Sequence, residues 1–230
     1  MRLDSVVERR LLVNYRVAPG AVAPLLPTGM RPQIVNGWAV AGICLIRLGR
    51  VRPAGLPDWF GLRSENAAHR IAVEWDGGGG VYIPRRDTGS ALNALAGGRV
   101  FPGVHHRVRF DVEEHGADLR VAYTGPGIEV SATGRVTAEL TGSALFADLA
   151  EASEFFRRGS VGYSAADGTH VDGLALETAS WRIEPVELGA AWSSYFEDPA
   201  RFPAGTAVLD SALVMRNLPA TWRAVARRAA

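Results

Sequence analysis

Period-two alternation of apolar and polar residues runs through much of this chain and limits what it can fold into. Alternate side chains of a strand point to opposite faces of a sheet, so the pattern is typical of strands with one buried face. The alternating segments are residues 8–17, 38–48, 64–75, 104–113, 119–123, 128–140 and 174–187. Turn-forming residues separate several of them, as at residues 77–80, 115–118 and 125–127. We therefore predict a mainly β (α+β) fold built on an antiparallel sheet.

Helical patterns are fewer and shorter than the strand patterns. Residues 19–26 and 90–95 favour short helices, and residues 219–228 favour a closing helix. The best pattern is residues 143–158, where apolar residues fall at helical spacing and Gly159 supplies the stop. So few helices cannot cover the edges of so many strands, which favours a barrel or a strongly curved sheet. Glycine and proline are spread along the chain, so we predict a single domain over residues 1–230.

Composition excludes several classes of function. The net charge is +1, and basic and acidic residues are interspersed, so the basic stripe expected of a nucleic-acid partner is missing. Cys44 is the single cysteine, which rules out an internal disulfide and a cysteine-rich zinc site. The first ten residues carry five charges and no apolar core of a secretory signal, and no apolar run reaches a membrane span of about 18 residues. We expect a cytoplasmic protein with no membrane partner.

The chain contains no lysine: all 25 of its basic residues are arginine. Covalent catalysis through a Schiff base needs a side-chain amine. Any carbonyl chemistry of this protein therefore has to proceed without an imine to the chain.

Four ionisable residues fall in phase with apolar residues of three predicted strands. They are Arg9, Glu65, His69 and His106. In residues 104–112, for example, His106 alternates with the polar residues and shares its face with valines and a phenylalanine. Isolated buried charges are costly, so such groups are expected to pair with one another, to line a wet cavity or to become neutral.

A shared cavity would give each of the four a role toward an anionic substrate. Arg9 could hold a carboxylate, Glu65 and His69 could exchange protons, and His106 could donate to developing oxyanion charge. The competing interpretation is structural: Glu65 orients His69, Arg9 caps a strand end, and His106 is a satisfied core imidazole. Metal binding is not favoured, because the histidines lack the spacing of metal-binding motifs.

The stretch that contains His106 resembles the active-site stretch of acetoacetate decarboxylases. It reads Gly98-Arg99, five residues, then His105-His106-Arg107, where the family has Gly-Arg, five residues, Pro-Lys-Lys. The family's nucleophilic lysine falls on His106. Other parts of the chain are similar to the same superfamily in the same order: residues 13–17 with 19–27, Arg63-Ser64-Glu65, and residues 209–222.

Further motifs resemble one branch of that superfamily, the DUF2071 (YqjF-like) proteins. These are Leu26-Pro27-Thr28-Gly29-Met30, Asn36-Gly37-Trp38-Ala39, Ser64-Glu65-Asn66 leading to Arg70, and Gly159-Ser160-Val161-Gly162-Tyr163-Ser164. The resemblance implies a conical antiparallel β-barrel with an internal pocket, and it places the family's second active-site glutamate on Glu65. Both lysines are missing, the first glutamate aligns near Val40, and the substrate-binding arginine aligns with Glu8, beside Arg9. These departures argue against acetoacetate decarboxylation by the family mechanism.

We therefore expect an enzyme without cofactor or metal that acts on a small carbonyl or carboxylate compound by a lyase or cyclisation step. The candidate catalytic residues are His106, Glu65 and His69, and the candidate substrate-binding residues are Arg9 and, at the rim, Tyr163. The main alternative is a non-catalytic protein that binds a small molecule in the same pocket. A third interpretation is an interaction module built on Trp59-Phe60. The expected partner is an anionic or carbonyl-containing small molecule. The sequence leaves open whether the protein forms a homo-oligomer.

Overall fold

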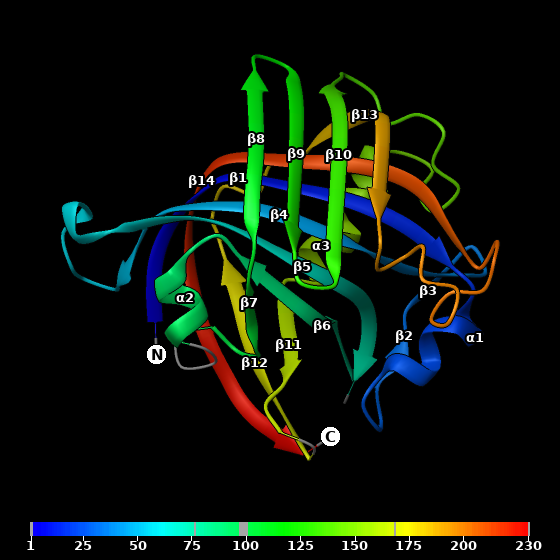
Figure 1. Ribbon diagram of the computed structural model, residues 1–230, viewed down its shortest axis with the longest axis horizontal. Coiled ribbons are helices and arrows are strands. Elements are labelled where there is room, and N and C mark those ends of the chain that lie inside the picture. The colour runs from blue at the N-terminus through cyan, green and yellow to red at the C-terminus, as the bar shows by residue number, and fades with distance from the viewer. Residues whose placement is uncertain (1, 76, 97–100, 168, 230) are drawn as a thin grey trace.

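The chain is mostly β-structure (Figure 1). The computed structural model describes residues 2–75, 77–96, 101–167 and 169–229. Its strands are β1 (Arg2–Val17), β2 (Arg31–Pro32), β3 (Ile34–Val35), β4 (Trp38–Pro53), β5 (Leu62–Trp75), β6 (Gly78–Thr88), β7 (His105–Arg107), β8 (Arg109–His115), β9 (Asp118–Gly125), β10 (Ile128–Val136), β11 (Val161–Ala165), β12 (His170–Glu177), β13 (Glu184–Ser193) and β14 (Ala207–Ala229). Its helices are α1 (Pro19–Val22), α2 (Ala91–Ala96) and α3 (Leu149–Arg158), with 3-10 turns η1 (Ala23–Leu25) and η2 (Asp58–Phe60).

All the strands belong to one sheet. Its order is β1-β4-β5-β6-β11-β12-β14-β13-β10-β9-β8, and β14 also pairs with β1. The pairings are antiparallel except for β6 with β11 and β6 with β7, which are parallel. In Figure 1, β8, β9, β10 and β13 cross in front of the long strands β1, β4 and β14. The two groups of strands thus form crossed layers of one strongly curved sheet.

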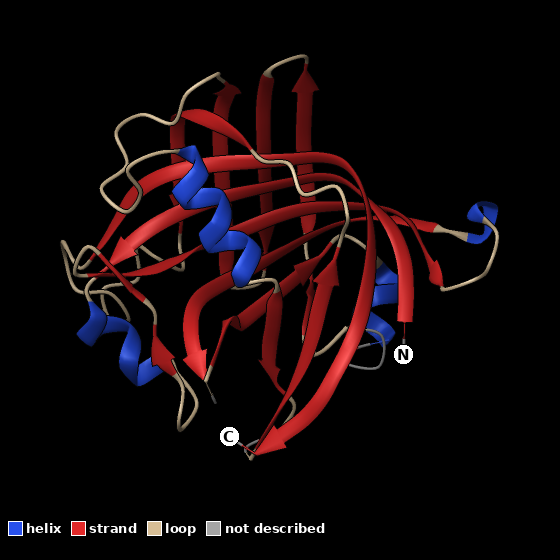
Figure 2. Cartoon of the chain, turned by 180° about the vertical axis from the view of Figure 1, so that it is seen from behind, coloured by secondary structure: helices blue, strands red, loops and turns tan. Residues whose placement is uncertain are grey.

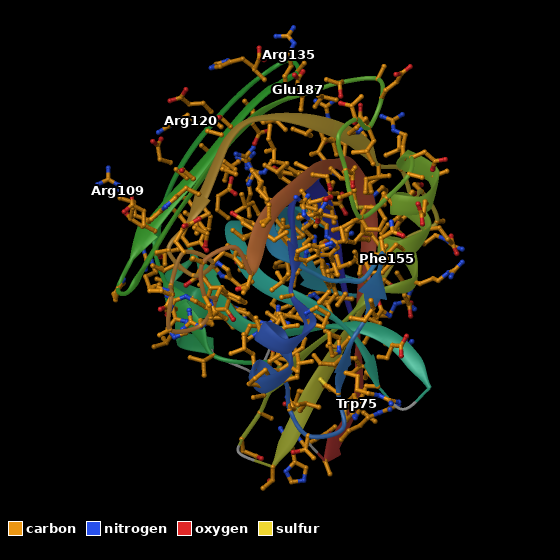
Figure 3. All side chains as sticks on the ribbon, turned by 90° about the vertical axis from the view of Figure 1, so that its right-hand side faces the viewer. Trp75, Arg109, Arg120, Arg135, Phe155 and Glu187 are labelled. Atoms are coloured by element: carbon orange, nitrogen blue, oxygen red, sulfur yellow. The ribbon has the colours of Figure 1, made fainter. Side chains whose placement is uncertain are left out.

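Two apolar cores fill the two faces of the long strands. The first core lies toward β8, β9 and β10, and includes Leu11, Leu45 and Val121. The second core lies on the opposite face and includes Leu12 and Phe156. Figure 2 shows α3 lying across this second face. On the outer side of β8, β9 and β10, by contrast, arginines such as Arg109, Arg120 and Arg135 extend into solvent (Figure 3).

The helix α3 forms where the sequence pattern favours it. Asp148 caps its N-terminus by accepting from the Glu151 amide at 2.8 Å, and the Glu151 side chain accepts from the Ala147 amide at 2.7 Å. Arg157 and Arg158 occupy its last turn, where they complement the helix dipole. None of the described helices is long and apolar enough to cross a membrane.

Most predicted elements are confirmed, but the predicted strand 128–140 ends at Val136, and three further predictions are wrong. Residues 8–17, 38–48, 64–75 and 119–123 lie in strands, and helices overlap residues 19–26, 90–95 and 143–158. Residues 174–187 form parts of two strands, because the chain leaves the sheet between β12 and β13. Residues 219–228 are not a helix but the end of β14, which pairs with β1 and β12. Segment 104–113 is divided between β7 and β8.

Candidate functional site

A buried carboxylate, Asp87 on β6, organises the polar cluster nearest to the predicted site. Its side chain is fully buried, and Arg85 Nε donates to its two oxygens at 3.0 and 3.1 Å. The Tyr123 hydroxyl donates to it at 3.3 Å, and His106 Nδ1 lies 4.0 Å from it. Burial raises the pKa of Asp87, while Arg85, His106 and Tyr123 act in the opposite direction.

Strand register brings this cluster together. β6 lies between β5 and β7, so Asp87 is level with Ala67 on one side and with His106 on the other. His106 Nδ1 donates to the Arg86 carbonyl oxygen at 3.1 Å. A carbonyl oxygen can only accept, so this contact fixes the proton on Nδ1 in the neutral ring and leaves the Nε2 lone pair free.

His106 faces a cavity of about 400 Å³ that we call the arginine pocket. Its polar walls are Arg85, His106, Ser194, Tyr195, Asp198 and Arg201. The Arg201 guanidinium lies over the Tyr195 ring at 4.3 Å and is 3.3 Å from Asp198. Burial raises the pKa of Tyr195 to about 12, so its hydroxyl stays protonated and can donate. The pocket therefore offers a histidine, a phenol and two guanidinium groups to a small anion, and one carboxylate, Asp198, lies among them.

Arg9 and Glu65 do come together, but away from the arginine pocket. The Arg9 side chain is 0% exposed, with Nη2 at 2.6 Å from Glu65 Oε2 and Nη1 at 2.5 Å from Glu114 Oε1. Arg47 Nε lies 2.5 Å from the other Glu65 oxygen. These four residues form what we call the Arg9 cluster. Enclosed and neutralised by two carboxylates, the Arg9 guanidinium has no open side for a substrate carboxylate.

His69 lies apart from Glu65 on the same strand. The two positions are four residues apart in β5, roughly 13 Å of extended chain. His69 Nε2 is 3.1 Å from the Ser193 hydroxyl, and its ring packs at a tilt against Tyr195, with 4.4 Å between the ring centres. Tyr195 lies between His69 and the arginine pocket. Burial, with the charges of Arg85 and Arg201, lowers the pKa of His69 to about 3. The expected Glu65–His69 pair is not formed.

The expected inward direction of His106 is corrected to a partly exposed one. Its side chain is 44% exposed, and Val104, expected on the same buried face, is 71% exposed. The cause is the break at Val108, whose amide bonds to the Thr88 carbonyl while the chain passes from β7 to β8. A face assignment does not carry across such a break.

Tyr163 is likewise not at a pocket rim. It lies in β11, buried in the first core, with its ring edge-on to Trp75 at 5.1 Å. Gly80 and Gly173 lie so close to this ring that a Cβ on either would approach it within 3.0 Å. Trp59 and Phe60, the basis of the third interpretation, are 77% and 51% exposed on η2 and stack on each other at 3.6 Å.

Sequence reasoning missed Arg85, Asp87, Tyr195 and Arg201. Residues 78–88 begin with glycines and contain Pro84, which hid the strand β6. Within it, Arg85-Arg86-Asp87 reads as a solvated charge run. Once residues 78–88 are recognised as a strand, the period-two alternation places Asp87 and Arg86 on opposite faces of the sheet. Without that recognition, no sequence signal distinguishes the two residues. Gly98 and Arg99 of the family motif lie outside the described residues.

No group of three or more metal-ligating side chains occurs among the described residues.

A family model covers most of the chain. Residues 6–212 match DUF2071, described as an uncharacterized conserved protein. No curated protein matches the chain.

Solved structures with the same fold are enzymes related to acetoacetate decarboxylase. The acetoacetate decarboxylase of Legionella pneumophila is 11% identical, with a TM-score of 0.64 over 99% of this chain and 88% of that one. An acetoacetate decarboxylase-like enzyme from Sphingomonas wittichii RW1 is 12% identical, with a TM-score of 0.65 over 100% and 92%. The enduracididine biosynthesis enzyme MppR, complexed with pyruvate, is 14% identical, with a TM-score of 0.62 over 99% and 89%. At these identities the likeness concerns the fold.

Proposed function

The chain belongs to the DUF2071 family, and we propose that it is a cofactor-independent enzyme of acetoacetate decarboxylase-like fold acting on a small carbonyl or carboxylate compound. One observation carries the proposal: His106, fixed through Nδ1 and adjacent to a buried carboxylate, faces a pocket that also holds Arg85, Tyr195 and Arg201. Of the expected site residues, His106 keeps its role, whereas substrate binding passes from Arg9 and Tyr163 to the arginine pocket.

Substrate binding would rest mainly on Arg201. In the described part of the chain each pocket arginine has a carboxylate partner, Arg85 with Asp87 at 2.9 Å and Arg201 with Asp198 at 3.3 Å, and the Arg201 pair is the longer one. A substrate carboxylate can pair with the planar guanidinium fork, and the Tyr195 hydroxyl can donate to a neighbouring oxygen. This geometry would orient a short oxo acid with its reactive carbon toward His106.

His106 would transfer the proton. With Nδ1–H bound to the Arg86 carbonyl, the neutral ring accepts a proton only at Nε2, and Asp87 stabilises the resulting imidazolium. Enolate charge that develops on the substrate oxygen can be stabilised by the Tyr195 hydroxyl and by protonated His106. A lyase or cyclisation step of this kind needs no imine, in keeping with the absence of lysine.

The pairing of β14 with β1 supports describing the sheet as the conical antiparallel barrel of this fold. Through that pairing, the sequence of neighbours β1, β4, β5, β6, β11, β12 and β14 returns to its start. We propose that this closure makes the inner polar residues rigid enough to hold a reactive geometry.

A non-catalytic binding protein is the second candidate. Glu65, the residue that matches the family's active site most directly, is held by Arg9 and Arg47. Both of its carboxylate oxygens are ion-paired within the chain, so neither is turned toward a substrate. This observation favours a pocket that binds and does not react.

The test uses His106→Gln, with His170→Gln as a matched control. His170 has the same 44% exposure and also lies beside an aspartate, Asp167, but on β12 outside the pocket. Short 2-oxo and 3-oxo acids are incubated with each protein and followed by NMR. We expect turnover by wild type and His170→Gln, and a loss of roughly 100-fold or more in His106→Gln.

Binding is followed separately by thermal stabilisation with the same acids. Arg201→Gln should lose the stabilisation, and His106→Gln should keep most of it. If wild type is stabilised by an acid that is recovered unchanged, the protein is the binder of the second candidate. If no oxo acid stabilises or reacts, both candidates fail.

A further inference from the structure

The loop between β4 and β5 projects from the body of the protein. It comprises residues 50–63, and η2 forms its tip. Figure 1 and Figure 2 show this segment extending beyond the rest of the sheet. We call it the aromatic arm. It shares no residue with the arginine pocket.

Apolar side chains gather on the aromatic arm. Nine large apolar side chains are exposed among the described residues, and four of them lie here: Leu56, Trp59, Phe60 and Leu62. None of the four belongs to either core or packs against it. Exposed apolar surface that is gathered in one place is typical of a site that contacts a protein or a membrane.

The aromatic arm has a defined shape that holds these side chains outward. Asp58 accepts from Arg50 at 2.7 Å and lies 2.5 Å from Arg52, whose Nε donates to the Leu56 carbonyl oxygen at 2.7 Å. A Cβ on Gly61 would collide with Arg50 Cα, so the two sides of the arm are in close contact there. A surface that is already ordered loses little conformational entropy when it binds.

Positive charge exceeds negative charge around the arm. Residues 50–63 carry three arginines and one carboxylate, Asp58. Residues 2–8 of β1, beside the β4 side of the arm, add Arg2, Asp4 and Glu8, and Glu8 accepts from Arg63 Nε at 2.7 Å. The two segments together thus contain four arginines and three carboxylates.

An open cleft at the base of the arm adds two further arginines. Its volume is about 790 Å³, and Arg63, Arg107 and Arg109 lie in its walls. In the described part of the chain no carboxylate pairs with Arg107 or Arg109, and Figure 3 shows Arg109 extending into solvent. The one carboxylate of the cleft wall, Glu65, belongs to the Arg9 cluster, whose two arginines and two glutamates balance. The base of the arm is therefore positively charged.

We propose that the aromatic arm binds the surface of an anionic lipid bilayer. Trp59 and Phe60 enter the headgroup region, and the arginines at the base pair with lipid phosphates. Arg63 follows Phe60 by three residues, roughly 10 Å of extended chain. Apolar surfaces that bind in the plane of a membrane enter it by about 5–10 Å, so the tip reaches the acyl chains when the base is level with the phosphates.

Two features favour a bilayer over a groove on another protein. The apolar rings at the tip and the guanidinium groups behind them follow the order of hydrocarbon and phosphate in a leaflet, and the positive base complements anionic headgroups. Such a contact needs no spanning segment. It therefore revises the expectation of no membrane partner, which rested on the lack of a long apolar run, and it is independent of the reaction proposed for the arginine pocket.

Vesicle sedimentation tests the role of the apolar tip. Wild type is mixed with vesicles of phosphatidylcholine alone and of phosphatidylcholine with phosphatidylserine. We expect binding to the mixed vesicles that weakens as NaCl is added, and binding to phosphatidylcholine alone that is weaker by about tenfold or more. Combining Trp59→Ala with Phe60→Ala should weaken binding by about tenfold or more. Trp192→Ala, at an exposed tryptophan on β13, is the matched control and should bind as wild type does.

The same assay tests the positive base. Arg107→Gln and Arg109→Gln should each weaken binding to the mixed vesicles by about fivefold. Arg135→Gln, at an exposed arginine on β10, should leave it unchanged.

Fluorescence quenching tests which ring enters the bilayer. Lipids brominated on their acyl chains quench a tryptophan that lies among them. Trp59→Phe keeps an aromatic ring, so it should keep most of the binding but lose the quenching seen in wild type. Trp192→Phe should keep both.

Wild type that binds neither kind of vesicle overturns the proposal, as does binding that the Trp59→Ala, Phe60→Ala double variant leaves unchanged. Sedimentation velocity without lipid examines the other occupant of the arm. If wild type is an oligomer and the double variant a monomer, the arm joins two copies of the chain and the membrane proposal is overturned. Quenching that persists in Trp59→Phe overturns it as well.

Discussion

Buried charged side chains in this protein are accommodated in three different ways. Arg9 has two carboxylate partners, and Asp87 has Arg85 and a tyrosine hydroxyl. Arg70, also fully buried, bonds to the Asn14 side chain and lies over the Phe156 ring at 4.8 Å.

His69 should make the stability of the fold depend on pH. In the unfolded chain it gains a proton as the pH falls below about 6.5, whereas burial keeps the folded ring neutral down to about pH 3. The stabilisation of the fold that comes from keeping His69 neutral is therefore complete above pH 6.5. As the pH falls toward 3, the free energy of unfolding decreases by about 1.4 kcal/mol per pH unit.

Urea denaturation of wild type and His69→Gln between pH 7 and pH 4.5 measures this effect. The free energy of unfolding of wild type should fall more steeply than that of the variant, and the difference in slope isolates His69. The carboxylates and the other histidines are the same in both proteins, so their contributions to the pH dependence cancel in the difference. Parallel profiles would contradict the assignment of a neutral, buried imidazole.

The burial of single residues was predictable from the sequence, but their partners were not. Period-two phase placed Arg9 and His69 on a buried face, and both are fully buried. Their partners Glu114 and Ser193 lie 105 and 124 residues further along the chain. Phase along one strand carries no information about which strand lies opposite. The grouping of the candidate site therefore had to come from the fold.

Among the elements, α3 contributes most to the second core outside the sheet. Phe156 is buried against Arg70 and Phe146, while Phe155 on the same helix is only partly buried. η2, by contrast, carries its aromatic rings in solvent. Truncation of an aromatic ring to alanine should therefore lower the free energy of unfolding much more in α3 than in η2.

Phe156→Ala should cost about 3–5 kcal/mol of unfolding free energy, because it leaves a cavity under α3. Trp59→Ala on η2 should change it by no more than about 0.5 kcal/mol, because that ring is exposed. Chemical denaturation of both variants measures the difference. A large loss in Trp59→Ala would mean that η2 packs against another part of the protein.

Long-range pairing also explains which elements the sequence concealed. Residues 219–228 are rich in alanine and arginine, which favour helices, yet they form strand because β1 and β12 bond to them along both edges. β6 was hidden by glycines at its start, and its place is set by β5 and β11 beside it. Local propensity was overridden in both cases by neighbours distant in sequence.

At the scale of the whole molecule, β1 and β14 hold the sheet together. β1 is paired along both edges, with β4 and with β14, from Arg9 to Val17. Its middle residues, such as Leu12 and Val13, are fully buried. The η2 turn and α2 lie at the periphery and make few packing contacts with either core.

Hydrogen exchange should follow this arrangement. Amides of β1 from Leu11 to Val13 and their partners in β14 should be among the slowest, opening only with global unfolding. Amides around η2 and α2 should exchange many-fold faster. Peptide-level mass spectrometry measures both. Fast exchange in β1 would contradict a sheet joined through β14.

The pairing of β1 with β14 also governs how the protein is made. On the ribosome β14 is synthesised after every other strand of the sheet, about 190 residues after β1. At roughly 5–20 residues per second, β1 waits some ten to forty seconds with one edge unpaired. During that interval nascent chains on the same messenger present the same open edge to one another, so chaperone occupancy of this segment should rise with translation load.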